Sequence, residues 1–269
     1  MFIVGVLNIT PDSFFDGGRY LDPDAGVEQA LRLASEGADL VDVGGESTRP
    51  GAPEVSEEEE LRRVLPVLER LAAARFPVPI SIDTSRPAVA RAALGAGAAM
   101  VNDVRALADP ELARVVAEAG VAVVLMHMRG TPRDMRDRAV YGSLVSEVRT
   151  ELAFAMARAV RAGIGEDRIV LDPGIGFAKT AEQSVELLAR VPDLVVLGRP
   201  LLVGPSRKSF IGAITGAPAE DRLAGTLAAV TAAVLGGATF IRVHDVAASR
   251  QAARVASALR ASGGSGGKP

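Results

Sequence analysis

Short runs of β-branched and aliphatic residues recur along the whole chain, and segments with helical spacing of apolar residues separate them. The runs are continuously apolar rather than alternating, which is typical of parallel strands that are buried on both faces. The pattern predicts eight strands, at residues 2–7, 39–43, 79–82, 99–101, 121–126, 168–171, 201–203 and 239–243.

The segments between these strands carry the signals of helix ends. Asp22 and Asp109 each precede a proline at the first expected helical position, where a carboxylate caps the free N–H groups. Ser56 begins a capping box ahead of an amphipathic stripe that extends over residues 61–71. Pro66 lies inside this stripe, so a kink is expected there.

Eight strands that alternate with helices over roughly 250 residues predict an α/β fold, a closed (β/α)8 TIM barrel in a single domain. An open, doubly wound sheet is the alternative, but no G-x-G-x-x-G segment opens a helix after the first strand. No linker divides the chain. We expect residues 1–260 to form the barrel and the Gly- and Ser-rich residues 261–269 to form a flexible tail.

Composition excludes several classes of function. With 30 basic against 33 acidic residues and a net charge of −3, nucleic acid and anionic membranes are not expected partners. The absence of cysteine excludes a thiolate nucleophile, and the presence of only His127 and His244 excludes a multi-histidine metal site. Residues 223–241 are uncharged, but their Gly pair and β-branched end favour a buried helix and strand over a membrane span. No secretory signal is visible, and we expect a cytoplasmic protein.

Polar residues gather where the predicted strands end, which in TIM barrels is the catalytic face. Asn8, Asp83, Asn102 and Asp172 each follow an apolar run. Two carboxylates and an amide form a suitable floor for a planar ligand edge with several N–H donors. The alternatives are that each residue caps the next helix, or that the oxygens bind Mg²⁺.

A basic cluster follows the last two strands and includes Lys208, Ser209, Arg242 and His244. Loops after strands seven and eight commonly bind phosphate in this fold, although a solvated basic turn is the simpler alternative. Arg242 and His244 are two residues apart on a strand, so both side chains should point the same way.

Three further residues fall near the same face. His127 follows the fifth strand, and a structural ring bonded to a carbonyl is favoured over a catalytic one. Phe14 and Phe177 lie in expected top-face loops, where they could anchor the loops or wall a flat ligand.

Eight sequence blocks occur in a specific order: GVLNITPDSF (5–14), DVGGESTRPG (42–51), IDT (82–84), VNDV (101–104), MHMRGTP (126–132), LDPGIGFAK (171–179), SRKS (206–209) and RVHD (242–245). In this order and spacing the chain resembles the dihydropteroate synthases, from Asn8 to Asp245. This family condenses 6-hydroxymethyl-7,8-dihydropterin diphosphate with 4-aminobenzoate, giving 7,8-dihydropteroate and pyrophosphate, and is the sulfonamide target.

The resemblance implies a role for each matching position. Asp83, Asn102, Asp172 and Lys208 would bind the pterin, and Asn8, Arg242 and His244 the diphosphate, with Asn8 placing Mg²⁺. The residues around the aminobenzoate would be Phe14, Thr48, Arg49, Pro50, Phe177 and Ser209. Asn8, Lys208, Arg242 and His244 would form the catalytic set. The family is usually homodimeric, and we expect the same here.

The neutral arylamine and the charge left by a departing diphosphate favour a dissociative, cation-like reaction as the mechanistic hypothesis. Three alternatives remain at this point. They are a pterin-binding methyltransferase with a similar floor, a Schiff-base aldolase that uses Lys208, and a non-catalytic pterin-binding protein.

Overall fold

The strands lie parallel in one eight-stranded sheet, in the order β6-β5-β4-β3-β2-β1-β8-β7. The computed structural model describes residues 1–10, 22–47, 51–52 and 54–263. A bridge between Leu171 and Leu201 joins the two ends of the order, so the sheet closes into a barrel. Its strands are β1 (Phe2–Asn8), β2 (Leu40–Gly44), β3 (Ile80–Asp83), β4 (Met100–Asp103), β5 (Ala122–Met126), β6 (Ile169–Asp172), β7 (Leu202–Val203) and β8 (Phe240–Val243).

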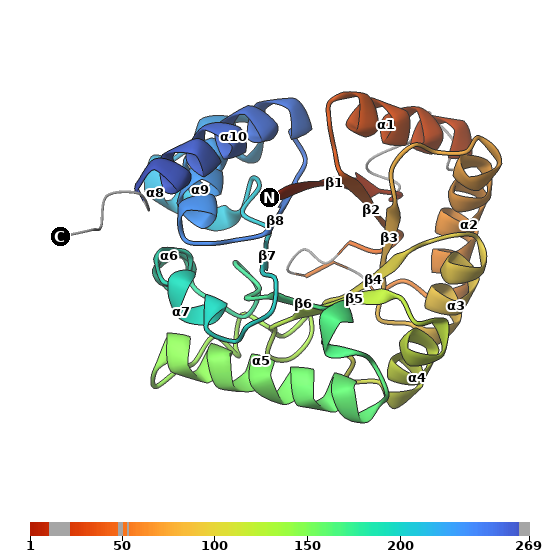
Figure 1. The fold of residues 1–269 in the computed structure, drawn as a ribbon, viewed down its shortest axis with the longest axis horizontal. Coiled ribbons are helices and arrows are strands. Elements are labelled where there is room, and N and C mark those ends of the chain that lie inside the picture. Colours follow the sequence, from red (N-terminus) through yellow and green to blue (C-terminus); the bar gives the residue numbers. More distant parts are fainter. Residues whose placement is uncertain (11–21, 48–50, 53, 264–269) are drawn as a thin grey trace.

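Helices form an outer ring around these strands, as Figure 1 shows in a view along the barrel. They are α1 (Pro23–Ser35), α2 (Glu57–Ala73), α3 (Pro87–Gly95), α4 (Pro110–Ala119), α5 (Leu144–Arg161), α6 (Ala181–Ala189), α7 (Pro192–Val195), α8 (Ser209–Thr215), α9 (Leu223–Leu235) and α10 (Val246–Gly263). Two short 3-10 turns, Glu166–Arg168 and Ala219–Asp221, complete the described secondary structure. The (β/α)8 barrel expected from the sequence is confirmed.

Local chemistry sets the helix ends much as the sequence predicts. The side chains of Asp22, Asp109 and Ser56 accept backbone N–H bonds at the starts of α1, α4 and α2, respectively. Gly120 ends α4 in the left-handed conformation, with φ of 64°. Helix α2 continues through Pro66 to Ala73, so the proline does not end the helix.

The core has two layers. A small cluster from the strands fills the inside of the barrel: Val4, Leu40, Met100, Val124, Val170 and Leu202, with Ala122 and Phe240 packed against it. A larger cluster lies between the strands and the helices. Because strand side chains alternate in direction, every second strand position points into the barrel.

Two segments test the expected boundaries. Residues 223–241 form α9 and the start of β8, as expected, and no helix in the described part of the chain has the length and apolar character of a membrane span. Helix α10 continues to Gly263, so residues 261–263 are helical rather than part of a tail. The favourable i→i−4 hydrogen bonds outweigh the weak helix propensity of Ser262 and Gly263.

Candidate active site

Strand alternation carries polar side chains into the barrel directly above its apolar plug. On four strands, the residue two positions after an inner apolar residue is polar or charged. The pairs are Leu40 and Asp42, Met100 and Asn102, Val170 and Asp172, and Phe240 and Arg242. The carboxyl end of the barrel therefore holds a polar layer that is surrounded by low-dielectric protein.

These side chains meet in one pocket. It is lined by Val6, Asp83, Asn102, Val104, Met126, Asp172, Gly174, Ile175, Phe177, Gly204, Ser206, Lys208, Arg242 and His244. The structure thus brings together seven of the predicted site residues: Asp83, Asn102, Asp172, Phe177, Lys208, Arg242 and His244. Arg242 and His244 line the same pocket, which agrees with their two-residue spacing.

A hydrogen-bonded network connects the polar layer across four strands, β2, β3, β4 and β8. The Arg242 guanidinium donates from Nε to Asp42 Oδ2 (2.7 Å) and from Nη2 to Asp83 Oδ2 (2.8 Å). Asn102 donates from Nδ2 to the same Asp42 oxygen at 2.9 Å. Burial raises the pKa of Asp83, although the charge of Arg242 favours its ionised form.

A second acid–base pair, Asp172 and Lys208, lines the same pocket. Burial raises the pKa of Asp172 to about 6, against the N–H bond that its Oδ1 accepts from Gly174 at 2.7 Å. Burial lowers the pKa of Lys208 to about 8, and Asp172 is its main favourable charge. The Lys208 ammonium lies 3.9 Å from the centre of the Phe177 ring, a cation–π contact.

Glycines in the segment after β6 allow this close packing. Gly174 has φ of 67°, and a Cβ there would lie 2.0 Å from the carbonyl oxygen of His127. Gly176 has φ of 80°, and a Cβ there would lie 3.2 Å from Cδ of Lys208. Only glycine combines this backbone conformation with the available space.

His244 acts as a neutral hydrogen-bonding group rather than a cation. Its pKa is lowered, first by partial desolvation and then by the positive charge of Arg242. Ser206 Oγ accepts from the backbone N–H of His244 at 3.2 Å and lies 3.0 Å from Nδ1 of its ring. Ser206 thus contacts both the backbone and the ring of His244, and both residues line the pocket.

The remaining predicted residues divide into two groups. Asn8 is half-buried at the end of β1, and Ser209 is exposed in the first turn of α8; neither lines the pocket. Phe14, Thr48, Arg49 and Pro50 lie outside the described residues. Arg207, next to Lys208, pairs instead with Asp245 through two bonds of 2.9 and 2.7 Å.

The ring of His127 is buried and bonded on both nitrogens, as expected of a structural residue. The prediction that a carbonyl group is its partner is wrong. Its Nε2 lies 2.9 Å from a Glu151 oxygen, and its Nδ1 lies 3.0 Å from Nζ of Lys179. Lys179 also donates to the carbonyl of Phe177 at 2.9 Å. The partners of the ring are therefore a carboxylate and a buried amine in place of the expected carbonyl. Burial lowers the pKa of that amine, Lys179, to about 7.

Sequence reasoning missed Asp42 and Lys179. Asp42 is 1% exposed and lies within a strand whose other residues are apolar or glycine. An acidic residue inside such a run is a signal in itself, because a buried carboxylate requires a charged or donor partner. For Lys179 the signal is rarity, because the chain contains only three lysines.

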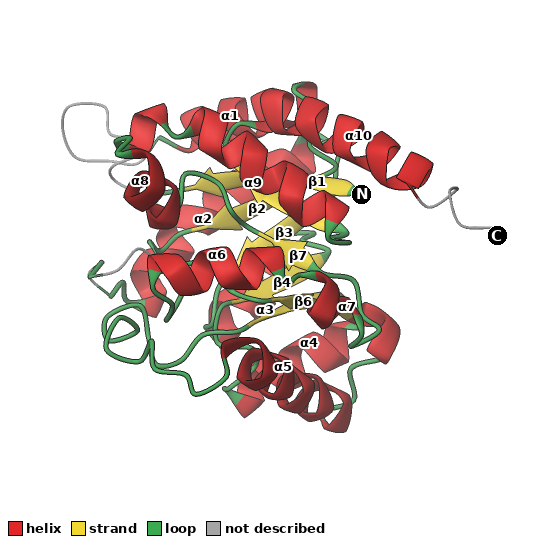
Figure 2. Cartoon of the chain, turned by 90° about the vertical axis from the view of Figure 1, so that its left-hand side faces the viewer, coloured by secondary structure: helices red, strands yellow, loops and turns green. Residues whose placement is uncertain are grey.

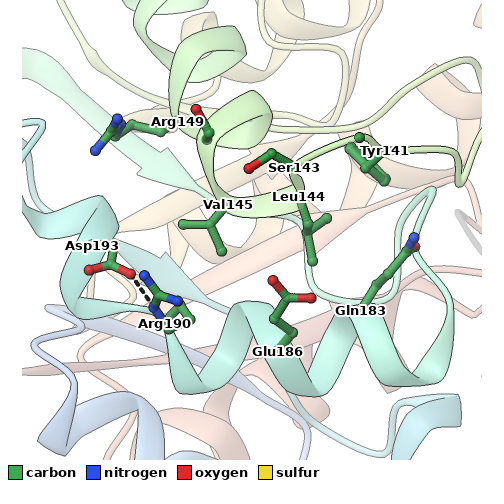
Figure 3. Close-up of a pocket in the computed structure, with 11 residues that line it drawn as sticks. Tyr141, Ser143, Leu144, Val145, Arg149, Gln183, Glu186, Arg190 and Asp193 are labelled. Atoms are coloured by element: carbon green, nitrogen blue, oxygen red, sulfur yellow. Dashed lines mark hydrogen bonds and ion pairs between the residues drawn. The ribbon is translucent and has the colours of Figure 1, made fainter.

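A second pocket, of about 540 Å³, lies on the outside of the barrel between the start of α5 and α6 (Figure 3). Its lining mixes basic and acidic side chains, including Arg149, Arg190, Glu186 and Asp193. No strand residue contributes to it. Figure 2 shows α5 and α6 as neighbours on one side of the barrel. This pocket lacks the convergent chemistry of the strand ends.

Comparison with known proteins identifies the family of the chain. The sequence model of the family described as "Pterin binding enzyme" matches residues 4–244. The dihydropteroate synthase of Synechocystis is 48% identical, over 96% of this chain and 90% of that protein. The Escherichia coli K12 enzyme of the same name is 45% identical, over 95% of this chain and 90% of that protein.

Solved structures give the same result. Xanthomonas albilineans dihydropteroate synthase with 4-aminobenzoic acid superposes with a TM-score of 0.90 at 49% identity, covering 97% of this chain and 93% of that one. The complex of the enzyme from that organism with 7,8-dihydropteroate has a TM-score of 0.87 at 46% identity, covering 97% and 94%. The chain belongs to the pterin-binding enzyme family and, within it, to the dihydropteroate synthases.

Proposed function

We propose that the pocket at the carboxyl ends of the strands is the active site of the transferase reaction of this family. In that reaction, 6-hydroxymethyl-7,8-dihydropterin diphosphate and 4-aminobenzoate give 7,8-dihydropteroate and pyrophosphate. The observation that carries the assignment is the convergence of Asp83, Asn102, Asp172, Lys208 and Arg242 in one pocket. Solved relatives that hold 4-aminobenzoic acid or 7,8-dihydropteroate support the same substrates for this chain.

In this proposal, the acidic side of the pocket holds the pterin. Asp83 and Asp172 supply carboxylate acceptors, and the Nδ2 bond to Asp42 leaves Oδ1 of Asn102 as a third acceptor. The 2-amino and ring N–H groups of a dihydropterin are donors, so the two edges are complementary. Lys208 and Phe177 contribute a cation and an aromatic face beside Asp172.

The basic residues of the pocket would hold the diphosphate. Arg242 contributes a permanent cation, and His244 contributes an imidazole ring that lines the same pocket. Mg²⁺ is a further proposal. It usually binds through one or two carboxylates together with substrate phosphates and water. The resemblance to the family adds the Asn8 amide oxygen, at the end of β1, as a protein ligand. Mg²⁺ would supply charge neutralisation to the leaving diphosphate.

We infer a dissociative mechanism for the bond exchange. The bond between the pterin methylene carbon and the diphosphate oxygen breaks first, and its electron pair leaves with the pyrophosphate. The amine nitrogen of 4-aminobenzoate then forms the new C–N bond and loses one proton to solvent or pyrophosphate. Carboxylates Asp83 and Asp172 stabilise the electron-poor pterin, and Arg242 stabilises the leaving anion.

Pyrophosphate release from both substrates with Mg²⁺ is the direct test of the activity. A chain that instead transferred a methyl group from a reduced folate, or formed a borohydride-trapped adduct on Lys208, would contradict it. Positional isotope exchange tests the mechanism: a dissociative step scrambles the bridging oxygen of unreacted pterin diphosphate. Rates that depend strongly on arylamine nucleophilicity, without scrambling, would contradict that mechanism.

Two broader expectations remain proposals. The exposed apolar residues Leu235 on α9 and Val255 and Leu259 on α10 support a homodimer through the C-terminal helices. Light scattering after gel filtration tests this, and a Leu259→Glu variant should shift the mass toward the monomer. A cytoplasmic location, which cell fractionation tests, stays a prediction.

A further inference from the structure

Asp42 is not among the residues assigned above to contact the substrates, yet it bonds two residues that are, Asn102 and Arg242. Its side chain is 1% exposed, and one oxygen, Oδ2, accepts from both Asn102 and Arg242. These donors come from β4 and β8, which are separated in the sheet by β3, β2 and β1. Asp42 therefore joins two proposed ligand-binding groups that do not touch each other in this network.

Stability gives no reason to keep a carboxylate at this position. Burying an ion pair costs desolvation energy that its attraction often fails to offset, so apolar replacements are frequently as stable. The second oxygen, Asp42 Oδ1, is buried and has no hydrogen-bond partner among the described residues, which adds to the cost. A feature that costs stability at the base of a substrate pocket is typical of a functional constraint.

The chemistry of Asp42 determines how both neighbours face the pocket. An ionised carboxylate can only accept hydrogen bonds, so it selects the Asn102 orientation with Nδ2 toward Asp42 and Oδ1 free. The bond to Nε of Arg242 fixes the guanidinium plane from its inner side and leaves the Nη groups for other partners. When Asp83 turns its oxygens to a ligand, Arg242 still has a buried counter-charge in Asp42.

We propose that Asp42 is a positioning residue, which orients Asn102 as a hydrogen-bond acceptor and Arg242 as a donor for the pterin diphosphate. The inference rests on the proposed roles of Asn102 and Arg242 in the active site. It extends that site by a residue that acts through others and does not itself contact the substrate.

The test is Asp42→Asn, which keeps the shape of the side chain and removes its charge. A misplacement of binding groups by about 1 Å can lower the reaction rate about 10²-fold. We expect the KM for pterin diphosphate to rise by roughly tenfold to hundredfold. The KM for 4-aminobenzoate should stay within about twofold, because none of these contacts reaches Phe177.

The matched control is Asp103→Asn, the same change at another buried aspartate, which is also 1% exposed. Asp103 bonds Ser85 and the backbone N–H groups of Arg105 and Leu107, and not the network of Arg242. The Asp103→Asn variant should have a lower melting temperature than wild type, and its KM for pterin diphosphate should stay within about twofold of the wild-type value. A parallel rise of both KM values in Asp42→Asn, or no rise, would overturn the proposal.

A double-mutant cycle with Asn102→Ala identifies the route. The ligand is the pterin alcohol, which lacks the diphosphate, and calorimetry measures its affinity. The loss of affinity caused by Asp42→Asn should fall below about twofold in the Asn102→Ala background. Fully additive losses would contradict action through Asn102. If Asp42→Asn does not fold, Asp42→Glu keeps the charge and displaces the carboxylate, and wild-type binding by that variant would equally overturn the proposal.

Failure of the underlying site assignment would look different. Asn102→Ala and Arg242→Ala would then themselves bind the pterin diphosphate with wild-type affinity, whatever Asp42→Asn does. The two failures are therefore separated by the single variants alone.

Discussion

Asp172 and Lys208 show how one residue pair can match a ligand that is itself both polar and aromatic. Their mutual attraction offsets part of the desolvation that each suffers in the pocket, so both remain available for hydrogen bonds. Asp172 is further held by the N–H of Gly174, which fixes one of its oxygens. The other oxygen of Asp172 remains able to accept hydrogen bonds, and the residue lines the pocket. A purely capping role would instead require the carboxylate to face the start of a helix.

We therefore expect Asp172→Ala to abolish measurable binding of the pterin diphosphate. The variant removes a charged acceptor and leaves Lys208 without its main counter-charge, and hydrogen bonds to charged groups contribute about 1.5–3 kcal/mol each. Isothermal calorimetry is the measurement. Glu186→Ala, in the outer pocket between α5 and α6, is the control and should bind as wild type. Near-normal affinity of Asp172→Ala would contradict the floor assignment.

A variant of Arg242 should distinguish binding of the diphosphate from binding of the pterin ring. Arg242→Ala removes the cation beside the proposed diphosphate position, so affinity for the pterin diphosphate should fall far more than affinity for the pterin alcohol. Comparison of the two Kd values by calorimetry measures this. Because Asp42 and Asp83 lose their shared partner, the variant should also be destabilised, by about 3–5 kcal/mol for a broken buried pair. Equal losses for both ligands would remove the proposed role.

At the scale of elements, the segment from Asp172 to Lys179 is held from both ends. Its first residue lies in the pocket, and its last residue lies behind it, bonded to His127 and to the carbonyl of Phe177. Lys179 thereby fixes the backbone that presents the Phe177 ring. The cost is a buried amine whose pKa is lowered from 10.5 to about 7.

This cost predicts a distinct pH dependence of stability. Between about pH 7 and 10.5 the unfolded chain keeps the Lys179 proton and the folded chain does not, so stability rises with pH in this window. One such proton contributes at most about 1.4 kcal/mol per pH unit. Urea unfolding of wild type and Lys179→Met at several pH values measures the difference. Wild type should gain stability relative to the variant up to about pH 10, and parallel curves would contradict a deprotonated Lys179.

Most elements could be predicted from the sequence, because continuous apolar runs and capping residues are local signals. The eight expected strands agree with the observed ones to within one residue at most ends. The pocket residues at strand ends followed from the barrel alone. What could not be predicted depends on distant partners: Asp42 meets Arg242 across 200 positions, and Lys179 meets His127 across 52. Which ring atom or oxygen faces which donor is decided only when the strands are side by side.

At the scale of the whole molecule, the barrel has one weakly closed side. Strand β7 contains two residues, and between β6 and β7 the sheet is closed by the single bridge of Leu171 and Leu201 and a bond from the Leu171 N–H to the Pro200 carbonyl at 2.9 Å. Strands β1 and β2 instead pair at five positions. Local opening should therefore begin at the β6–β7 seam.

Hydrogen exchange tests this and connects the seam to function. Without ligand, peptides that cover residues 199–204 should exchange faster than peptides that cover 40–44. Asp172 lies on β6 and Lys208 follows β7, so a pterin bound to both would span the seam. At a ligand concentration of about 100 times Kd, a ligand that binds only the closed form lowers the population of the open form, and with it the exchange rate, by up to about 100-fold. Pterin diphosphate should thus protect residues 199–204 most strongly in wild type and much less in Asp172→Ala. Uniform protection of all strands, or equal exchange of both segments without ligand, would mean that the barrel opens as one unit and that the substrate does not close its weakest side.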